Sequence, residues 1–434
     1  MENFICKNIS RDKDGNLLFA GVSAEKMADK YGTPLYLMDE NRIREKVRCY
    51  KAAVKNAFGE KGNVLYASKA ASFKRIYEIM KEEEMGIDVV SLGEVFTAEK
   101  AGFPLCNAYF HSNNKTDEDI RVGIEKGVGY FVADNEEELY AIEQNASEKA
   151  VEQKVLLRIT PGIDPHTFAA VSTGKVDSKF GSAIETGAAD KIVKTALSLK
   201  HVKLVGFHCH VGSQVFDSEV FLLTAEVMLG FIASVKEKYG FLAEKLDLGG
   251  GFGVRYLESQ PDMDIKSNIE QIGFFVRNKC KDLGIEMPEI CFEPGRSIVA
   301  DAGMTVYTVG SVKKIPEFIN YVSVDGGMTD NIRYAMYKAK YTVMAAKDKN
   351  EKKMSCSLAG RCCESGDLVA ENVLLPENVK RGDRVAVLTT GAYNYSMSSN
   401  YNRIPRPPVV MLRGGADYVA VRRESYEDLT SLDN

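Results

Sequence analysis

Short apolar runs alternate with longer amphipathic stretches through the first two thirds of the chain. Each run is rich in β-branched, aromatic or aliphatic residues and ends in polar residues or glycine, a pattern typical of buried parallel strands. The runs lie at 64–67, 87–90, 108–111, 130–133, 155–160, 204–211, 245–248 and 289–293. Between them, apolar residues recur with helical spacing at 72–84, 94–101, 117–126, 135–145, 188–199, 219–239 and 265–283.

Alternating strand and helix units predict the architecture of this part of the chain. An α/β fold with a parallel (β/α)8 barrel of the TIM type, over residues 38–296, accounts for all eight strands. A doubly wound open sheet has the same order of elements and is the structural alternative. In both folds the carboxyl ends of the strands gather on one side.

The pattern changes after Pro294, where strand-like runs are joined by glycine, proline and asparagine turns without long helices between them. The runs lie at 298–300, 305–309, 321–324, 354–358, 367–370, 384–388, 409–412 and 418–421. They predict an all-β domain, a sandwich or barrel. Because the run at 17–21 would add a strand to it, we expect residues 1–37 and 297–434 to form the β domain, with the barrel inserted between its two pieces.

Composition and charge narrow the possible partners. The 434 residues are 45% hydrophobic, so the chain can bury large cores. Its 56 basic and 61 acidic residues give a net charge of -5 without a basic block, which argues against nucleic acid. We expect a cytoplasmic protein without membrane contact, since no apolar run has the length of a membrane span and the start does not resemble a signal peptide. The nine cysteines include no CxxC pair and indicate reduced thiols.

In a (β/α)8 barrel the chemistry lies at the carboxyl ends of the strands. The polar residues and glycines that follow the predicted strands are Lys69, Asp88, Ser91, His111, Asn113, Asn114, Asp134, Arg158, His208, His210, Ser213, 249–253 and 293–296. Lysine has a long flexible stem and an amine whose pKa falls on desolvation, which suits Schiff-base chemistry. Lys69 is therefore a candidate cofactor lysine. The alternative is an ordinary surface lysine that caps a strand-to-helix turn.

Loops with glycine follow the last two predicted strands, at 249–253 and 293–296. Glycines let backbone N–H groups close on an anion, and barrels often bind phosphate between these two loops. Tight turns also use glycine for its backbone freedom, so the glycine run alone does not identify a phosphate site.

Two histidines, His208 and His210, lie two residues apart on a strand and so face the same way. We expect no metal there, because no third ligand is spaced nearby. A histidine inside the barrel is one alternative, and an imidazole stacked on a flat cofactor ring is another, which suits His210. Glu293 either pairs with Arg296 or stands against a pyridine nitrogen and keeps it protonated.

Several motifs, in order along nearly the whole chain, resemble those of the fold-type III pyridoxal-phosphate decarboxylases. They are YASKA at 66–70, HCHVGSQ at 208–214, LDLGGGFG at 246–253, EPGR at 293–296, CESGD at 363–367 and GAY at 391–393. Within that family the diaminopimelate decarboxylases are resembled by DGGMTDNIR at 325–333, STG at 172–174 with SKFG at 178–181, and YSMSSNYN at 395–402. The resemblance implies pyridoxal 5'-phosphate as cofactor and the conversion of meso-2,6-diaminopimelate to L-lysine and CO2, the last step of lysine biosynthesis.

The resemblance also implies roles for residues at matching positions. Lys69 would bind the cofactor covalently, His210 would stack on its ring, and Glu293 would contact its ring nitrogen. The other implied cofactor contacts are Asp88, Ser213, Gly250, Gly251, Gly295, Arg296 and Tyr393. The implied substrate contacts are Arg296, Arg333, Tyr337, Glu364 and Tyr393. Cys363 would protonate the substrate carbon, arriving with Glu364 from the neighbouring subunit of a homodimer with shared active sites.

The far end of meso-diaminopimelate carries a second amino acid group, which needs a cation for its carboxylate and an anion for its ammonium. Arg333 and Glu364 supply these charges. Ornithine has no distal carboxylate to hold, which favours meso-diaminopimelate as substrate. From the residues alone, Arg333 is equally a rim residue of the β domain.

Three positions depart from the family pattern, Phe168, Tyr334 and Ile404, and all of them stand beside substrate motifs. They leave open a decarboxylase of ornithine, lysine or a carboxy-polyamine such as carboxynorspermidine. An inactive regulatory homologue is a third hypothesis, against which both Lys69 and Cys363 are present. Adjacent side chains on a strand face opposite ways, so only one of Cys362 and Cys363 can reach a site, and we choose Cys363.

Overall fold

The computed structural model describes residues 4–164 and 176–434. It divides into two compact units. The barrel unit comprises Lys46–Gly253 and Met263–Ser297, and the β unit comprises Met1–Glu45, Val254–Asp262 and Ile298–Asn434. The domain limits expected from the sequence stay a prediction. Phe168 and the motif at 172–174 lie outside the described residues.

Eight parallel strands close into a barrel in the barrel unit. In chain order they are β5 (Gly62–Ala67), β6 (Gly86–Val89), β7 (Ala108–Phe110), β8 (Tyr130–Ala133), β9 (Gln153–Thr160), β11 (Val202–His208), β12 (Lys245–Asp247) and β13 (Glu289–Phe292). Each pairs with the next, and β13 pairs with β5, which closes the sheet. The two-residue strand β10 (Ser182–Ala183) is added beside β9. The predicted (β/α)8 barrel is confirmed, and the open sheet is excluded.

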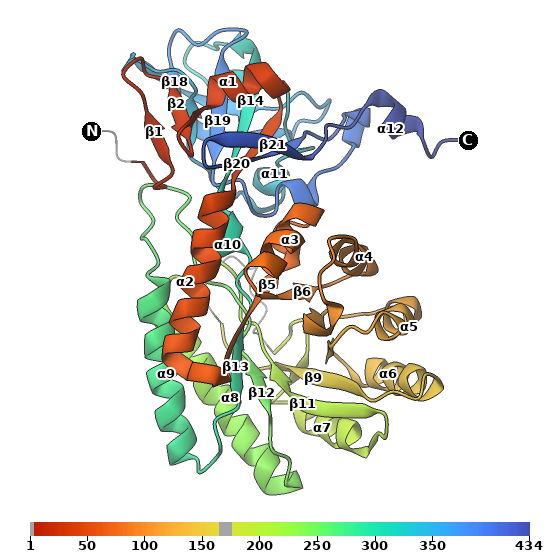
Figure 1. Ribbon diagram of the computed structural model, residues 1–434. Helices are drawn as coiled ribbons and strands as arrows, with labels where there is room; N and C mark the ends of the chain where they lie inside the picture. The colour runs from red at the N-terminus through yellow and green to blue at the C-terminus, as the bar shows by residue number, and fades with distance from the viewer. Residues whose placement is uncertain (1–3, 165–175) are drawn as a thin grey trace. The chain divides into compact units, whose positions relative to one another are not determined.

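Helices follow the strands in alternation and lie outside them (Figure 1). They are α2 (Glu40–Phe58), which begins in the β unit, then α3 (Lys74–Glu82), α4 (Leu92–Lys100), α5 (Asp117–Glu125), α6 (Glu136–Glu148), α7 (Ala188–Ser198), α8 (Ser218–Tyr239) and α9 (Ile265–Asp282). Several start on a side chain that accepts a backbone N–H bond, such as Ser91 for α4 and Asp217 for α8. These caps end each strand-to-helix turn sharply, which leaves the turn residues at the carboxyl end of the barrel.

The inside of the barrel is filled by side chains and is not a pore. Leu65, Tyr109, Val132, Leu156 and Val205 come from five different strands, are at most 2% exposed, and pack against one another. Fully burying such a side chain contributes roughly 1.5–3 kcal/mol. The packed interior therefore supports the loops at the strand ends.

Helix α8 is long and apolar enough, by length and composition alone, to cross a membrane. The expectation that no apolar run reaches that length is therefore wrong. Half of its most apolar window is buried. Phe221 of this helix stacks on Phe252 at a centroid distance of 4.5 Å, and Phe231 meets Phe207 of β11 edge-on. A core helix of the barrel unit accounts for this pattern.

The β unit contains a nine-stranded mixed sheet and a three-stranded sheet. The larger sheet comprises β4 (Leu35–Asp39), β14 (Gly303–Lys313), β15 (Asn320–Val324), β16 (Val343–Ala345), β17 (Lys353–Ala359), β18 (Leu368–Pro376), β19 (Arg384–Leu388), β20 (Val409–Arg413) and β21 (Ala416–Val421). The smaller comprises β1 (Ile9–Arg11), β2 (Leu17–Phe19) and β3 (Val22–Ser23). Short helices complete the unit: α1 (Ala24–Tyr31), α11 (Arg333–Tyr337) and α12 (Tyr426–Thr430).

Two details of this unit differ from the sequence prediction. The apolar run at 298–300 is not a strand, because helix α10 (Arg296–Val299) covers most of it. The run at 17–21 forms β2, which pairs with β1 and β3, whereas β4 is the N-terminal strand that pairs with β14 and β20 in the larger sheet. A buried run without alternating polar residues fits a helix as well as a strand, which explains the first error.

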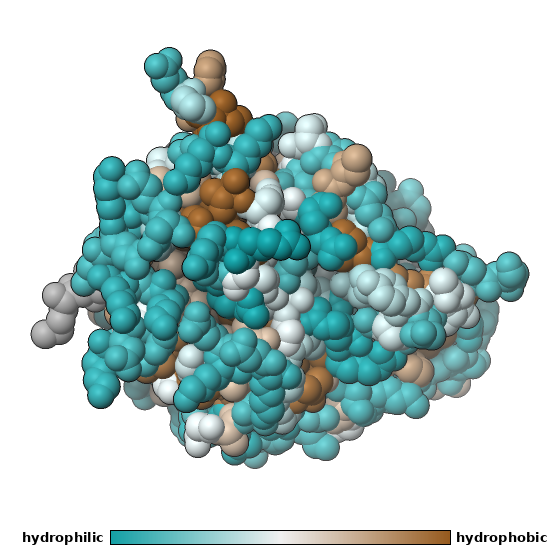
Figure 2. Space-filling model, turned by 90° about the horizontal axis from the view of Figure 1, so that it is seen from above, coloured by the Kyte–Doolittle hydropathy of each residue, from teal (hydrophilic) through white to brown (hydrophobic). Residues whose placement is uncertain are grey.

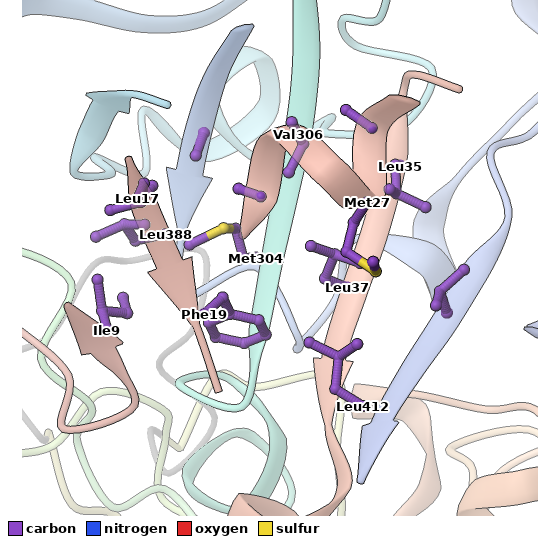
Figure 3. Close-up of a cluster of buried hydrophobic side chains, with 14 of the residues drawn as sticks. Ile9, Leu17, Phe19, Met27, Leu35, Leu37, Met304, Val306, Leu388 and Leu412 are labelled. Carbon is purple, nitrogen blue, oxygen red and sulfur yellow. The ribbon is translucent and has the colours of Figure 1, made fainter. Parts of the chain in front are cut away.

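The core of the β unit lies between the two sheets and α1. Phe19 and Leu17 of the small sheet, Met27 of α1, and Leu37 and Met304 of the large sheet are at most 7% exposed and point toward one another (Figure 3). On the surface seen from above, hydrophobic residues form separate patches among hydrophilic ones (Figure 2). N-terminal and C-terminal segments thus share one core, as the sequence pattern indicated.

Candidate active site

Lys69 lies in a single 3-10 turn, Ser68–Ala70, that follows strand β5. The parallel pairing of β5 with β6 sets Ala67 opposite Asp88, so Lys69 and Asp88 stand at the same end of neighbouring strands. Lys69 Nζ donates a hydrogen bond to Asp88 Oδ2 over 3.1 Å. The lysine side chain is 41% exposed and the aspartate is fully buried. The predicted cofactor lysine is therefore accessible and held by a buried carboxylate.

The glycine loop after β12 packs tightly against the loops that follow the two neighbouring strands. A Cβ on Gly250 would overlap the carbonyl oxygen of Glu293, after β13. Gly251 has a φ of +117°, and a Cβ there would overlap the carbonyl oxygen of Gly212, after β11. Only glycine fits such close approach of backbones. The structure thus brings Gly250 and Gly251 together with the other two predicted phosphate loops.

Two further contacts join the same loops. Arg296 Nε donates a hydrogen bond to Ser213 Oγ over 3.1 Å. Gly295 lies against Ala67, where a Cβ would come within 2.8 Å of the Ala67 Cβ. Ser213, Gly295 and Arg296 are therefore placed together at the carboxyl end of the barrel. The chain turns into helix α10 directly after Gly295.

His210 lies beside the glycine loop. Its Nδ1 accepts a hydrogen bond from the Gly250 N–H over 3.3 Å. The pKa of His210 is held well below its usual value, first by burial and then by the positive charge of Lys69. The imidazole is therefore neutral near pH 7, and a neutral aromatic ring suits stacking on a flat cofactor.

Two histidines flank Glu293, which follows β13 and is 5% exposed. His208 Nε2, at the end of β11, lies 3.1 Å from Glu293 Oε2 in a hydrogen bond. His111 Nε2, after β7, lies 2.7 Å from Glu293 Oε1, although this pair is not aligned as a hydrogen bond. Among the described residues Glu293 forms no ion pair with Arg296.

Contrary to the sequence expectation, further groups that can bind a metal do lie near His208. Ligand atoms of His111, His208 and Glu293 fall within 4.8 Å of one another, a spacing that could hold an ion. The sequence analysis missed this arrangement because the three residues follow three different strands.

The protonation states of this cluster follow from its burial. Burial alone would raise the pKa of Glu293, but the two histidines hold that pKa well below its usual value. Burial lowers the pKa of His208 to about 3, so its imidazole is neutral near pH 7. The pKa of Asp247 on β12 is raised well above its usual value, first by burial and then by the charge of Glu293. The pair of carboxyl groups therefore carries one negative charge, on Glu293.

The residues at this end of the barrel fit pyridoxal phosphate. Asp88 Oδ1, His208 Nδ1 and Glu293 Oε1 are buried polar atoms without a hydrogen-bond partner in the described part of the chain, and such atoms call for a ligand or water. The anionic Glu293 matches a protonated ring nitrogen. The glycine and Ser213 loops supply backbone and hydroxyl donors for a phosphate.

The β unit holds the predicted substrate residue Arg333, at the start of α11 and 7% exposed. Its guanidinium donates to Tyr341 Oη over 2.6 Å and to Tyr256 Oη over 3.4 Å. Tyr341 in turn donates to Asn394 Oδ1 over 3.3 Å. Within residues 4–164 and 176–434, no carboxylate forms an ion pair with Arg333. A buried guanidinium without an anion is a strong candidate for binding a ligand carboxylate.

The sequence analysis missed Tyr256, Tyr341 and Asn394. None of them lies in a motif with known chemistry, and they come from three separate segments of the β unit. Only the fold places them around Arg333.

The other predicted residues of the β unit lie apart from this cluster. Cys363 and Glu364 are exposed, and their hydrogen bonds are local: the Cys363 N–H donates to Asn402 Oδ1 over 3.0 Å, and Glu364 Oε1 accepts from the Ser365 hydroxyl over 3.3 Å. Tyr337 ends α11 and is half-buried, and Tyr393 has a φ of +61°. The structure does not bring Cys363 or Glu364 into contact with Arg333.

The neighbouring cysteine differs from Cys363 in its surroundings. Cys362 is partly buried, and its N–H donates to Asp367 Oδ2 over 2.7 Å. Burial, and then the charge of Asp367, raises the pKa of the Cys362 thiol to about 12. Cys362 is therefore a poor proton donor near pH 7, whereas Cys363 is exposed.

Of the departures from the family pattern, the structure describes two. Tyr334 is buried, and its hydroxyl bonds to the carboxylate of Glu371 within the β unit. Ile404 follows a single 3-10 turn, Tyr401–Arg403, and is partly exposed. Tyr334 therefore has a structural partner of its own.

Comparison with known proteins follows this geometry. Residues 40–300 match the family model described as the pyridoxal-binding domain of pyridoxal-dependent decarboxylases. The chain is 45% identical over 424 residues to the diaminopimelate decarboxylase of Bacillus subtilis, a match that covers 98% of this chain and 96% of that protein.

Solved structures agree with the sequence comparison. A diaminopimelate decarboxylase from M. jannaschii in complex with L-lysine matches with a TM-score of 0.92 and 35% identity, covering 99% of this chain and 98% of that one. A lysine/ornithine decarboxylase from Vibrio vulnificus complexed with putrescine matches less well, with a TM-score of 0.75 and 27% identity over 90% of this chain and 97% of that one.

Proposed function

Since the chain belongs to the diaminopimelate decarboxylases, a branch of the pyridoxal-dependent decarboxylases, we propose that it converts meso-2,6-diaminopimelate to L-lysine and CO2. Pyridoxal 5'-phosphate is the proposed cofactor. The observation that carries the proposal is the placing of Lys69, the glycine loops and the anionic Glu293 at one end of the barrel. A cofactor lysine, a phosphate cradle and a partner for a protonated ring nitrogen are thus all present.

The barrel residues hold and tune the cofactor in this proposal. Bound pyridoxal phosphate supplies the sink for the electron pair that departing CO2 leaves on the substrate carbon. Lys69 holds the group covalently and is displaced by the substrate amine. Glu293 keeps the ring nitrogen protonated, and the neutral ring of His210 stacks on the cofactor. Ser213, Gly250, Gly251, Gly295 and Arg296 bind the phosphate end, with Tyr393, and Asp88 positions Lys69.

The β-unit residues recognise the substrate and complete the reaction. Arg333 binds the distal carboxylate and Glu364 the distal ammonium, with Arg296, Tyr337 and Tyr393 as further substrate contacts. The buried, unpaired guanidinium of Arg333 supports this role. The Cys363 thiol gives a proton to the carbon from which CO2 has left, so one proton replaces one CO2.

We further propose a homodimer with shared active sites, in which Cys363 and Glu364 serve the site of the other subunit. Their exposure, and the absence of an ion pair on Glu364 among the described residues, support this proposal. We also propose that the enzyme works in the cytoplasm without nucleic acid, as its mixed charge suggests.

A decarboxylase of lysine or ornithine is the second candidate function. The fold likeness to the lysine/ornithine decarboxylase from Vibrio vulnificus favours it, but at lower identity. Lysine and ornithine have no distal carboxylate to neutralise Arg333, so the site favours meso-diaminopimelate.

The test is CO2 release by the purified protein, loaded with pyridoxal phosphate, from meso-diaminopimelate, ornithine, lysine and arginine in parallel. The visible absorbance band of bound cofactor is followed in the wild type and in Lys69→Ala. We expect release from meso-diaminopimelate alone, and loss of both the band and the activity in Lys69→Ala.

Each other outcome has a separate meaning. A cofactor band without release from meso-diaminopimelate would contradict the substrate. Release from none of the four, with a normal band, would favour an inactive homologue. An unchanged band in Lys69→Ala would overturn the cofactor lysine.

A further inference from the structure

Two imidazoles reach the carboxylate of Glu293 from different sides of the barrel. His208 ends β11 and contacts Oε2, and His111 follows β7 and contacts Oε1. The two rings meet edge-on with their centroids 4.7 Å apart. All three side chains are at most 5% exposed. The proposed roles of the cofactor and substrate residues leave both histidines without a function.

The charges around this cluster leave Glu293 without a fixed cation. In the described part of the chain neither lysine nor arginine forms an ion pair with it, and its only ionic neighbours are His111 and His208. The neutral imidazole of His208 can donate through Nε2–H to Glu293 Oε2. Asp247, on the next strand, is neutral, and Arg158 adds a more distant positive charge.

A carboxylate has about four lone-pair sites on its two oxygens. Two imidazoles use two of them and fix the plane of the group. Sites therefore remain for a third donor, and Oε1 lacks an aligned hydrogen bond. A protonated ring nitrogen would supply that donor.

We propose that His111 and His208 are positioning residues that orient Glu293 and keep it ionised toward the ring nitrogen of the cofactor. This inference rests on the proposed role of Glu293 in pyridoxal-phosphate chemistry. The histidines touch neither substrate nor cofactor in this account, so their effect passes through Glu293 alone. That restriction makes the proposal testable.

The experiment is a double-mutant cycle on the full-length protein loaded with pyridoxal phosphate. His208→Leu and His111→Leu each remove the N–H donor, and His208→Gln restores a donor of similar reach. Each leucine change is also made in Glu293→Gln. The control is His201→Gln, because His201 is partly exposed and pairs with Glu143 over 2.9 Å on the outside of the barrel.

Two readouts are taken on every variant. One is kcat for CO2 release from meso-diaminopimelate. The other is the nitrogen NMR shift of the ring nitrogen in protein loaded with isotope-labelled pyridoxal phosphate, which reports protonation without turnover. The second readout remains informative if the proposed substrate is wrong, so the two failures can be told apart.

We expect His208→Leu to lower kcat on the order of 10²-fold, as a misplaced catalytic group does, and to move the ring-nitrogen shift toward the unprotonated value. His208→Gln should recover most of both, and His111→Leu should act in the same direction. In the Glu293→Gln background each leucine change should alter kcat within about twofold, the scatter of additive effects. His201→Gln should change neither readout.

Three outcomes would overturn the proposal. The histidines would act independently if their effects persisted in full in Glu293→Gln. Loss of kcat with an unchanged nitrogen shift would assign them a merely structural role. Stoichiometric Zn²⁺ in the purified wild type, lost together with activity on chelation, would make the cluster a metal site.

Discussion

Strand β13 carries a glutamate at each end, and the two differ in how the chain treats their charge. At the amino end, Glu289 pairs with Lys245 Nζ over 2.7 Å and accepts from Asn63 Nδ2 over 3.0 Å. At the carboxyl end, Glu293 meets two imidazoles, one of them neutral. The same strand thus holds one charge that the protein balances and one that it leaves for another group.

The comparison separates a polar pocket from a functional one. The amino end of the barrel also has a pocket, of about 420 Å³, lined by residues that include Asn63, Lys245 and Glu289. Its charges are already paired, which suits a structural site. The carboxyl end has buried polar atoms that lack partners, which suits a site completed by a ligand. Charge left unpaired by the chain is the better indicator of chemistry here.

Glu293→Gln should give the largest effect and break the comparison if it fails. The amide is neutral and cannot keep a ring nitrogen protonated, so we expect kcat to fall on the order of 10³-fold, as when one preorganised catalytic group is removed. Melting temperature should hold or rise, since a buried charge is lost. Steady-state CO2 release and thermal unfolding measure the two quantities. A fall in kcat of less than tenfold would contradict the role of Glu293.

Gly250→Ala tests the loop packed against Glu293. Its Cβ would overlap the Glu293 carbonyl oxygen, which is backbone and cannot move aside cheaply. We expect a loss of about 1–3 kcal/mol in the free energy of unfolding, together with weaker binding of pyridoxal phosphate. Gly230→Ala is the matched control, because a Cβ there meets nothing within 4 Å. Equal effects of the two changes would argue against the tight loop.

Glu289→Gln sharpens the comparison from the other end of the strand. The change removes a partly exposed ion pair with Lys245, so we expect about 1 kcal/mol of lost stability. The kcat should match that of the wild type. Urea unfolding and CO2 release give the two values. A kcat as low as that of Glu293→Gln would mean that the ends of the strand do not differ in function.

Tyr341→Phe extends the comparison to the β unit, where Arg333 is a buried cation that the chain leaves without an anion. The change removes the 2.6 Å hydrogen bond that holds the guanidinium. One such bond is worth roughly 1 kcal/mol, so we expect KM for meso-diaminopimelate to rise about fivefold with little change in kcat. An unchanged KM would show that Tyr341 does not position Arg333.

Much of the fold could be predicted because its periodic patterns are local. All eight barrel strands lie where short apolar runs predict them, and Lys69, Ser213, Gly250 and Glu293 lie at the expected strand ends. The run at 298–300 was misread because a fully buried helix shows no strand alternation.

The contacts that define the site could not be predicted in the same way. His208 and Glu293 are 85 residues apart, and only the closed barrel brings them together. Tyr256 and Tyr341 reach Arg333 from other segments of the β unit, and no motif marks them. A sequence pattern indicates which way a side chain faces, but pairing between distant strand ends depends on the closed fold.

The unpaired Arg333 gives the most direct test of the account, because L-lysine is meso-diaminopimelate without its distal carboxylate. The measurement is the ratio of kcat/KM for meso-diaminopimelate to that for L-lysine, in the wild type and in Arg333→Met. The account predicts that the ratio is high in the wild type and falls on the order of 10²-fold in the variant, the cost of removing one partner of a buried charge pair. A ratio that stays constant, with both substrates slowed equally, would contradict it.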